Sequence, residues 1–161
     1  MNKPIIGVMG PGDGATQADI KYACKLGKLI AEQNWILLTG GRNSGVMNAA
    51  SKGAKKSGGL TVGILPSENK TGISEFVDIP ICTGIGSARN NVNVLSSDVV
   101  VACGTGAGTI SEITLALKAQ KPIVLLNPSK NMVKLLNELS YPNPDIASSP
   151  QNAIPLIRQI I

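Results

Sequence analysis

Short apolar runs rich in isoleucine and valine recur along the chain, and each run ends at a glycine or at a polar turn. Continuous apolar runs of this length are typical of strands that are buried on both faces, as in a parallel sheet. We therefore expect strands over residues 5–9, 35–38, 61–65, 77–79, 99–103 and 123–126.

Between these runs, apolar residues follow the i, i+3, i+4, i+7 spacing of an amphipathic helix. The pattern is clear over 20–31, and over 46–54 it is repeated with small residues, which lets a helix lie close to a sheet. Further helices are expected near 92–95, over 113–117 and from about 151 to 158. The alternation predicts a three-layer, doubly wound α/β domain. Its sheet is expected to be mostly parallel and Rossmann-like, with helices on both faces.

One domain accounts for the whole chain. A length of 161 residues is typical of one domain, and the sequence contains no internal repeat, linker or low-complexity tract. The stretch 66–74 is expected to be a surface loop, and Pro142, Pro144 and Pro150 mark a second irregular stretch. We therefore expect a single Rossmann-like domain over residues 1–161.

The residue types exclude several kinds of chemistry. The sequence has no histidine, so Ser-His-Asp catalysis and histidine-ligated metals are excluded. Cys24, Cys82 and Cys103 form no Cys-x-x-Cys pair, and we expect no metal held by protein ligands. Scattered cysteines in odd number favour a reducing cytosol over a disulfide framework. The apolar run 5–9 is too short for a secretory signal or a membrane span, which predicts a cytoplasmic protein without a membrane partner.

The chain is weakly basic, with 15 lysines and arginines against 10 acidic residues and a formal net charge of +5. This balance suits an anionic ligand. Lys21, Lys25 and Lys28 form a helical stripe that we interpret as a solvated face. Only 2% of the residues are aromatic, whereas single-stranded nucleic acids are bound by stacking on aromatic side chains. We therefore expect no nucleic-acid partner.

Glycines gather in four turns, three of which directly follow expected strands. Turns that leave parallel strands meet at one edge of the sheet, where ligands of open α/β sheets bind. Glycine lets a ligand approach the backbone, and a helix N-terminus favours phosphate. The turns predict an anion site, although glycines that only make tight turns would give the same pattern. One of the four turns is 84–87. In the other three turns, the candidate binding residues are Gly10, Gly12, Gly40, Gly41, Arg42, Gly45, Gly104, Thr105, Gly106, Ala107, Gly108 and Thr109.

Two common phosphate loops do not fit this sequence. A Walker A loop requires a lysine after its second glycine, but Gly45 is followed by Val46. A dinucleotide-binding fold has an acidic residue after its second strand, where this chain has Thr39-Gly40-Gly41. ATPase chemistry of the Walker type is therefore excluded, and NAD binding is disfavoured.

Arg89 and Glu112 are the charged residues of interest near these turns. Arg89 is expected in the first turn of a helix, where a cation opposes the helix dipole, and this placement favours an anionic partner. An ion pair with Asp98 or Glu112 would also explain it. Glu112 follows Thr109 at the spacing of a capping box, so it either caps the helix or accepts hydrogen bonds from a ligand.

Four motifs together resemble one known superfamily. They are Thr39-Gly-Gly-Arg-Asn-Ser-Gly-Val-Met47, Ala88-Arg-Asn90, Ser97-Asp98 and Gly104-Thr-Gly-Ala-Gly-Thr-Ile-Ser-Glu112. This Rossmann-like superfamily carries the label "possible lysine decarboxylase", which implies no such activity. Within it the chain is most similar to the molybdenum cofactor carrier proteins, over roughly residues 4 to 127.

The resemblance implies a protein that binds the molybdenum cofactor (molybdopterin) as cargo, protects it and passes it on, without being an enzyme. The glycine turns would hold the phosphate of the cofactor and Arg89 would add charge. Asn90, Asn93 and Glu112 would hydrogen-bond its ring. The resemblance also implies a homo-oligomer, either a dimer or a tetramer, and a molybdoenzyme that accepts the cofactor.

A related branch of the superfamily offers a different function. The Lonely-Guy-type phosphoribohydrolases release a nucleobase from a nucleoside 5′-monophosphate, and their catalytic residues match Arg89 and Glu112. These enzymes begin the phosphate loop with Pro-Gly-Gly and follow the arginine with lysine. This chain has Cys103-Gly104-Thr105 and Asn90 at those places, and both departures favour the carrier branch. A nucleotide-sensing module without turnover is the third interpretation.

Overall fold

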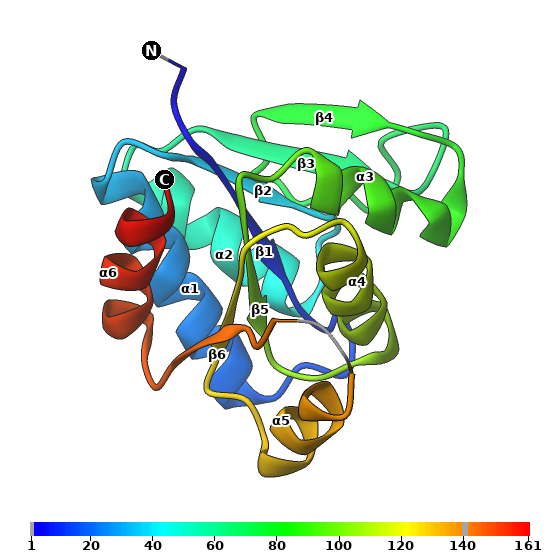
Figure 1. Cartoon of the computed structure of the whole chain (residues 1–161). Helices are drawn as coiled ribbons and strands as arrows, with labels where there is room; N and C mark the ends of the chain where they lie inside the picture. Colours follow the sequence, from blue (N-terminus) through cyan, green and yellow to red (C-terminus); the bar gives the residue numbers. More distant parts are fainter. Residues whose placement is uncertain (1, 140–141) are drawn as a thin grey trace.

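A computed structural model describes residues 2–139 and 142–161 of the chain. Its centre is a sheet of seven strands in the order β4-β3-β2-β1-β5-β6-β7, in which every neighbouring pair is parallel. The chain builds the sheet outward from β1 to β4, returns to place β5 beside β1, and continues outward to β7 (Figure 1). The strands are β1 (Ile5–Met9), β2 (Ile36–Thr39), β3 (Thr61–Leu65), β4 (Ile79–Cys82), β5 (Val99–Cys103), β6 (Ile123–Leu126) and β7 (Asp145–Ala147).

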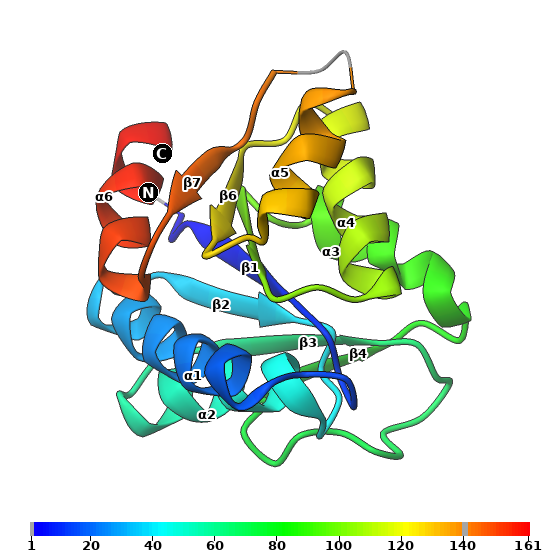
Figure 2. The same cartoon turned by 90° about the horizontal axis from the view of Figure 1, so that it is seen from below.

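Helices cover both faces of the sheet, so the predicted three-layer α/β fold is confirmed. One face carries α1, α2 and α6, and the other carries α3, α4 and α5, as the two views in Figures 1 and 2 agree. A single turn of 3-10 helix, η1 (Gly86–Ala88), leads directly into α3. The helices are α1 (Gln17–Glu32), α2 (Gly45–Lys56), α3 (Arg89–Leu95), α4 (Ala107–Lys118), α5 (Lys130–Asn137) and α6 (Pro150–Ile160).

The core is aliphatic and lies in two layers, one on each side of the sheet. Neighbouring residues of β5 alternate between the layers, because Val100 packs towards α3 and α4 whereas Val101 packs towards α1 and α2. Helices α1 and α2 lie unusually close together at Gly27 and Gly53. A β-carbon at either glycine would overlap a backbone carbonyl oxygen of the other helix, which explains the small residues in the α2 pattern.

The helices are longer than the expected stretches, most of all α4, which begins at Ala107. Three further elements differ from the sequence-based expectation. Strand β4 begins at Ile79, two residues later than predicted, because Asp78 uses its carboxylate to accept hydrogen bonds from Thr61. Strand β7 and helix α5 were not expected from the pattern. β7 is a three-residue edge strand that carries little hydrophobic signal, and α5 starts at a serine cap, where Ser129 Oγ accepts from Met132 N at 3.2 Å.

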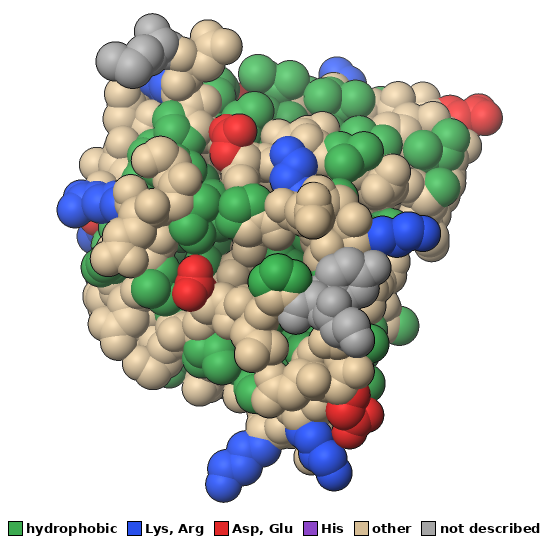
Figure 3. All heavy atoms as spheres, viewed as in Figure 1, with side chains coloured by type: hydrophobic (Ala, Val, Ile, Leu, Met, Phe, Trp, Pro, Cys, Tyr) green, Lys and Arg blue, Asp and Glu red, His purple; other side chains and the backbone are tan. Residues whose placement is uncertain are grey.

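The surface carries charges of both signs. On the face drawn in Figure 3, lysine and arginine side chains are spread among acidic and apolar ones. The Lys28–Glu32 pair, 3.6 Å apart and about half exposed, is of the kind that contributes little to stability. Among the helices of the described residues, none is both long enough and apolar enough to cross a membrane.

Candidate functional site

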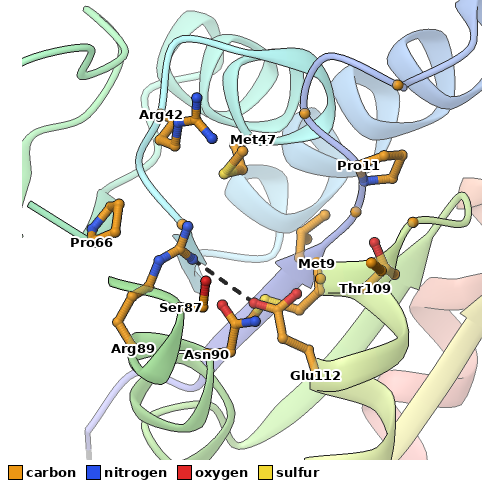
Figure 4. A pocket seen from close by; sticks show the side chains of 18 of the residues that line it. Met9, Pro11, Arg42, Met47, Pro66, Ser87, Arg89, Asn90, Thr109 and Glu112 are labelled. Atoms are coloured by element: carbon orange, nitrogen blue, oxygen red, sulfur yellow. Dashed lines mark ion pairs between the residues drawn. The ribbon is translucent and has the colours of Figure 1, made fainter. Parts of the chain in front are cut away.

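A cleft of about 520 Å³ opens at the carboxyl ends of β1, β2 and β5. The chain changes direction here, because β2 lies on one side of β1 and β5 on the other. Ligands of open α/β sheets bind at such a switch point. Turns that are far apart in the sequence therefore meet around one cavity (Figure 4).

Most of the residues selected from the sequence line this cleft. They are Gly10, Gly12, Gly40, Arg42, Arg89, Asn90, Thr105, Gly106, Ala107, Gly108, Thr109 and Glu112. Gly41, Gly45 and Gly104 are not among its lining residues within the described chain. All three have positive φ angles, of 74°, 48° and 82°. Gly41 packs against Gly63, Gly45 against the carbonyl groups of Pro11 and Gly12, and Gly104 against Asp19. These glycines shape the turns that bound the cleft.

The cleft also contains residues that the sequence analysis did not select. They are Val8, Met9, Pro11, Gly14, Met47, Pro66, Gly86 and Ser87. Pro11, Gly14, Gly86 and Ser87 belong to the glycine turns and could have been chosen from that position alone. Met9 and Met47 could not, because an apolar residue at the end of a strand or in a helix is most often part of the core. Here both methionines border the cavity while almost fully buried.

Arg89 opens α3, as predicted, and is 8% exposed. Its guanidinium lies where a β-carbon of residue 40 would stand, which explains the glycine there. Nη1 is 3.9 Å from Glu112 Oε1, so Glu112 is the ion-pair partner (Figure 4). Asp98 instead accepts a hydrogen bond from Ile5 N at 2.7 Å. Burial lowers the pKa of Arg89. The negative charge of Glu112 opposes this shift, and the positive charge of Arg42 adds to it.

The capping role considered for Glu112 is wrong. Helix α4 begins at Ala107 with Gly106 as its N-cap residue, so Thr109 and Glu112 both lie within the helix. The Glu112 carboxylate is 5% exposed and accepts a hydrogen bond from Asn93 Nδ2 at 2.8 Å. Burial raises the pKa of Glu112, although the Asn93 hydrogen bond and the Arg89 charge act in the opposite direction. Asn93 thus fixes the position of the Glu112 carboxyl group at the border of the cleft.

The start of α4 is open towards the cavity. Side chains of Thr16, Ser129 and Ser149 cap α1, α5 and α6, whereas no side chain of the described residues caps α2, α3 or α4. The first N–H groups of a helix have no partner within it and carry partial positive charge. Thr109 Oγ1 is buried beside them and has no hydrogen-bond partner within the described chain. These donors form an arrangement suited to phosphate.

Among the cysteine and acidic side chains of the described residues, only Glu112 lines the cleft. Burial raises the pKa of Cys103 to about 12, with Asp19 adding to the effect, so its thiol stays protonated at neutral pH. Residues 2–139 and 142–161 contain no group of three or more histidine, cysteine, aspartate or glutamate side chains that could hold a metal ion.

We expect the free energy of unfolding to fall as the pH rises from the ordinary range of a glutamate towards the raised pKa of Glu112. In this window the unfolded chain has released the proton, whereas the folded chain still holds it. The stabilising contribution is therefore present at lower pH and lost as the pH passes the folded pKa. Urea unfolding at stepped pH should show a smaller fall for Glu112→Gln than for the wild type. Equal pH dependence in both proteins would contradict a raised pKa at Glu112.

The sequence profile of the SLOG cluster4 family matches residues 3–154. The molybdenum cofactor binding protein of Rippkaea orientalis is 61% identical, with a TM-score of 0.97 over 99% of this chain and 98% of that one. The molybdenum cofactor carrier protein of Chlamydomonas reinhardtii is 49% identical, with a TM-score of 0.93 over the same shares.

A more distant relative is the cytokinin riboside 5′-monophosphate phosphoribohydrolase of Mycobacterium tuberculosis, 28% identical over 68% of this chain and 63% of that enzyme. The superfamily resemblance expected from the motifs is thereby confirmed. The chain belongs to the SLOG cluster4 family, and its close structural homologues are molybdenum cofactor carrier proteins.

Proposed function

We propose that this chain binds the molybdenum cofactor in the cleft, protects it and passes it on. The observation that carries the proposal is the uncapped start of α4, because its first residues, Thr109 included, line the same cavity as Glu112. A phosphate group fits the start of α4, and a ring bearing N–H groups fits the Glu112 carboxylate. Two molybdenum cofactor proteins that are similar to the chain over 99% of its length support this choice of ligand.

Each wall of the cleft would hold a different part of the cofactor. The backbone N–H groups of Ala107 to Thr109 would bind the phosphate, because the first N–H groups of a helix have no acceptor within the helix. The Glu112 carboxylate, held by Asn93, would accept hydrogen bonds from ring N–H groups, and Asn90 lies beside it in Figure 4. The thioethers of Met9 and Met47 would give the remaining wall a soft, apolar surface.

A phosphoribohydrolase is the second candidate. It is favoured by the Arg89–Glu112 pair, which lines the same cleft as the start of α4 and matches the catalytic pair of the related enzymes. Incubation with adenosine 5′-monophosphate tests it. Release of adenine by the wild type, abolished in Glu112→Gln, would favour the hydrolase and overturn the carrier. Tight nucleotide binding without adenine release and without cofactor binding would identify a nucleotide-sensing module.

The carrier proposal is tested by protection and transfer of isolated cofactor. The cofactor is kept in air with the protein for increasing times and then offered to a cofactor-free molybdoenzyme, whose recovered activity is measured. We expect the wild type to preserve activity that is lost in buffer alone. Activity no higher than in buffer would contradict the proposal.

Gly108→Val provides the matched variant for this assay. A β-carbon at Gly108 meets no atom within 4 Å, so the chain should fold normally while the valine side chain stands in the cleft. We expect Gly108→Val to lose most of the protection. Lys118→Gln, at the other end of α4 and exposed, should behave as the wild type. Full protection by Gly108→Val would place the cargo elsewhere.

We also propose a cellular location, an oligomeric state and a partner for this carrier. The carrier would work in the cytoplasm as a homo-oligomer and deliver its cargo to a molybdoenzyme. Exposed apolar side chains of Ile79, Ile81 and Leu95 would support self-association. Sedimentation that shows a strict monomer at micromolar concentration would contradict the oligomer.

A further inference from the structure

Two arginines stand across the cleft from the start of α4. Figure 4 shows Arg42 and Arg89 on one side of the cavity and Thr109 on the other, with Glu112 between them. We propose that Arg42 and Arg89 form a second oxyanion subsite, separate from the one at the start of α4. The cleft would then take a ligand that carries an anionic group at each end.

The backbone of Arg42 is fixed from both sides, so its side chain starts from a defined position. Ser74 N donates to Gly41 O at 2.9 Å, and Asn43 N donates to Gly72 O at 2.8 Å. These bonds surround a β-bridge between Arg42 and Ile73. The Arg42 side chain is exposed and enters no ion pair with the acidic residues of the described chain. Its charge is available to a ligand.

The charge of Arg89 is only partly compensated. The distance of 3.9 Å to Glu112 is too long for a charged hydrogen bond, which is typically about 2.7–2.9 Å. Arg89 Nε is buried and has no hydrogen-bond partner within residues 2–139 and 142–161. The site therefore holds two guanidinium groups against one carboxylate. Arg42 contributes to the lowered pKa of Arg89, as expected for like charges in one site. An oxyanion bound to both guanidinium groups would relieve this repulsion.

The identity of the second anion rests on the proposed function. The molybdenum cofactor carries a phosphate at one end and an anionic oxo-molybdenum dithiolene group at the other. With the phosphate at the start of α4, the metal-bearing end would face Arg42 and Arg89, and the ring between them would face Glu112. The arginine subsite would then distinguish cofactor that holds molybdenum from cofactor that lacks it.

The first test compares binding of molybdenum-loaded cofactor with binding of metal-free molybdopterin. Arg42→Gln should weaken binding of the loaded form about tenfold and of the metal-free form clearly less, since it removes one charge-assisted contact. Thr109→Val should weaken both forms alike. Lys118→Gln, which removes the same charge at the far end of α4, should change neither. Equal weakening of both forms by Arg42→Gln would overturn the assignment of the metal-bearing end.

The second test uses tungstate alone, so its result does not depend on the cofactor. Crystals soaked in tungstate should show one anomalous peak between the two guanidinium groups and another at the start of α4. Arg42→Gln should remove only the first peak. A single peak at α4 in the wild type would overturn the second subsite. Two tungstate peaks with no binding of either cofactor form would contradict the proposed function and leave the two-anion cleft standing.

Discussion

Replacing Arg89 by methionine and Glu112 by glutamine in the same chain should leave the fold intact and abolish tight cofactor binding. Both charges are buried, and removal of one leaves the other without its partner, whereas removal of both avoids that cost. A hydrogen bond to a charged group contributes about 1.5–3 kcal/mol, so the loss of two such groups should weaken binding by about a hundredfold or more. Equilibrium titration with isolated cofactor and thermal unfolding measure the two effects.

The single variant Arg89→Met is the control for this result. It leaves the Glu112 carboxylate with only its Asn93 hydrogen bond, and we expect it to be less stable than the double variant. The double variant leaves the net charge unchanged, and Lys118→Gln controls for the positive charge that the single variant Arg89→Met loses. If the double variant bound the cofactor as tightly as the wild type, Arg89 and Glu112 would be a structural pair without contact to cargo.

Gly53→Ala should destabilise the protein by about 3 kcal/mol or more, at the upper end of the cost of overpacking. Replacement of glycine by alanine inside a helix normally stabilises it by roughly 1 kcal/mol. Here the added methyl group would overlap the Cys24 carbonyl oxygen of α1, which belongs to the backbone and cannot rotate away. Denaturant unfolding should therefore show a lowered midpoint, with the helices forced apart or the fold lost.

Gly108→Ala is the matched control, because Gly108 also lies in a helix but faces open space. We expect it to be at least as stable as the wild type. The sign of the alanine effect should thus differ between the two glycines. Equal stability of Gly53→Ala and the wild type would mean that α1 and α2 separate without cost.

The doubly wound fold could be predicted because its central strands are buried on both faces. Continuous apolar runs such as 99–103 give a strong signal, and β5 has these bounds in the structure. The sheet edges carry less signal. Asp145 and Ile146 of β7 are exposed, so no hydrophobic pattern marks the strand. The start of β4 depends on tertiary hydrogen bonds between Asp78 and Thr61, which sequence periodicity cannot reveal.

The location of the candidate site in the fold could be predicted from the sequence, but the hydrogen bonds within it could not. Parallel topology brings the glycine turns together, and this follows from the strand pattern. The spacing of Thr109 and Glu112 suggested a capping box, yet the helix starts at Ala107 and both residues turn inward. The decisive partner of Glu112 is Asn93 on a different helix, and only the packing of α3 against α4 creates that contact.

A crystal structure of the protein with the isolated molybdenum cofactor tests the central claim most directly. Our account predicts that the cofactor lies in the cleft, with its phosphate on the N–H groups at the start of α4 and its ring beside Glu112. The anomalous signal of molybdenum would mark the other end of the cargo. A cofactor bound elsewhere, for example along the lysine-bearing face of α1, with the cleft free of it, would contradict the account.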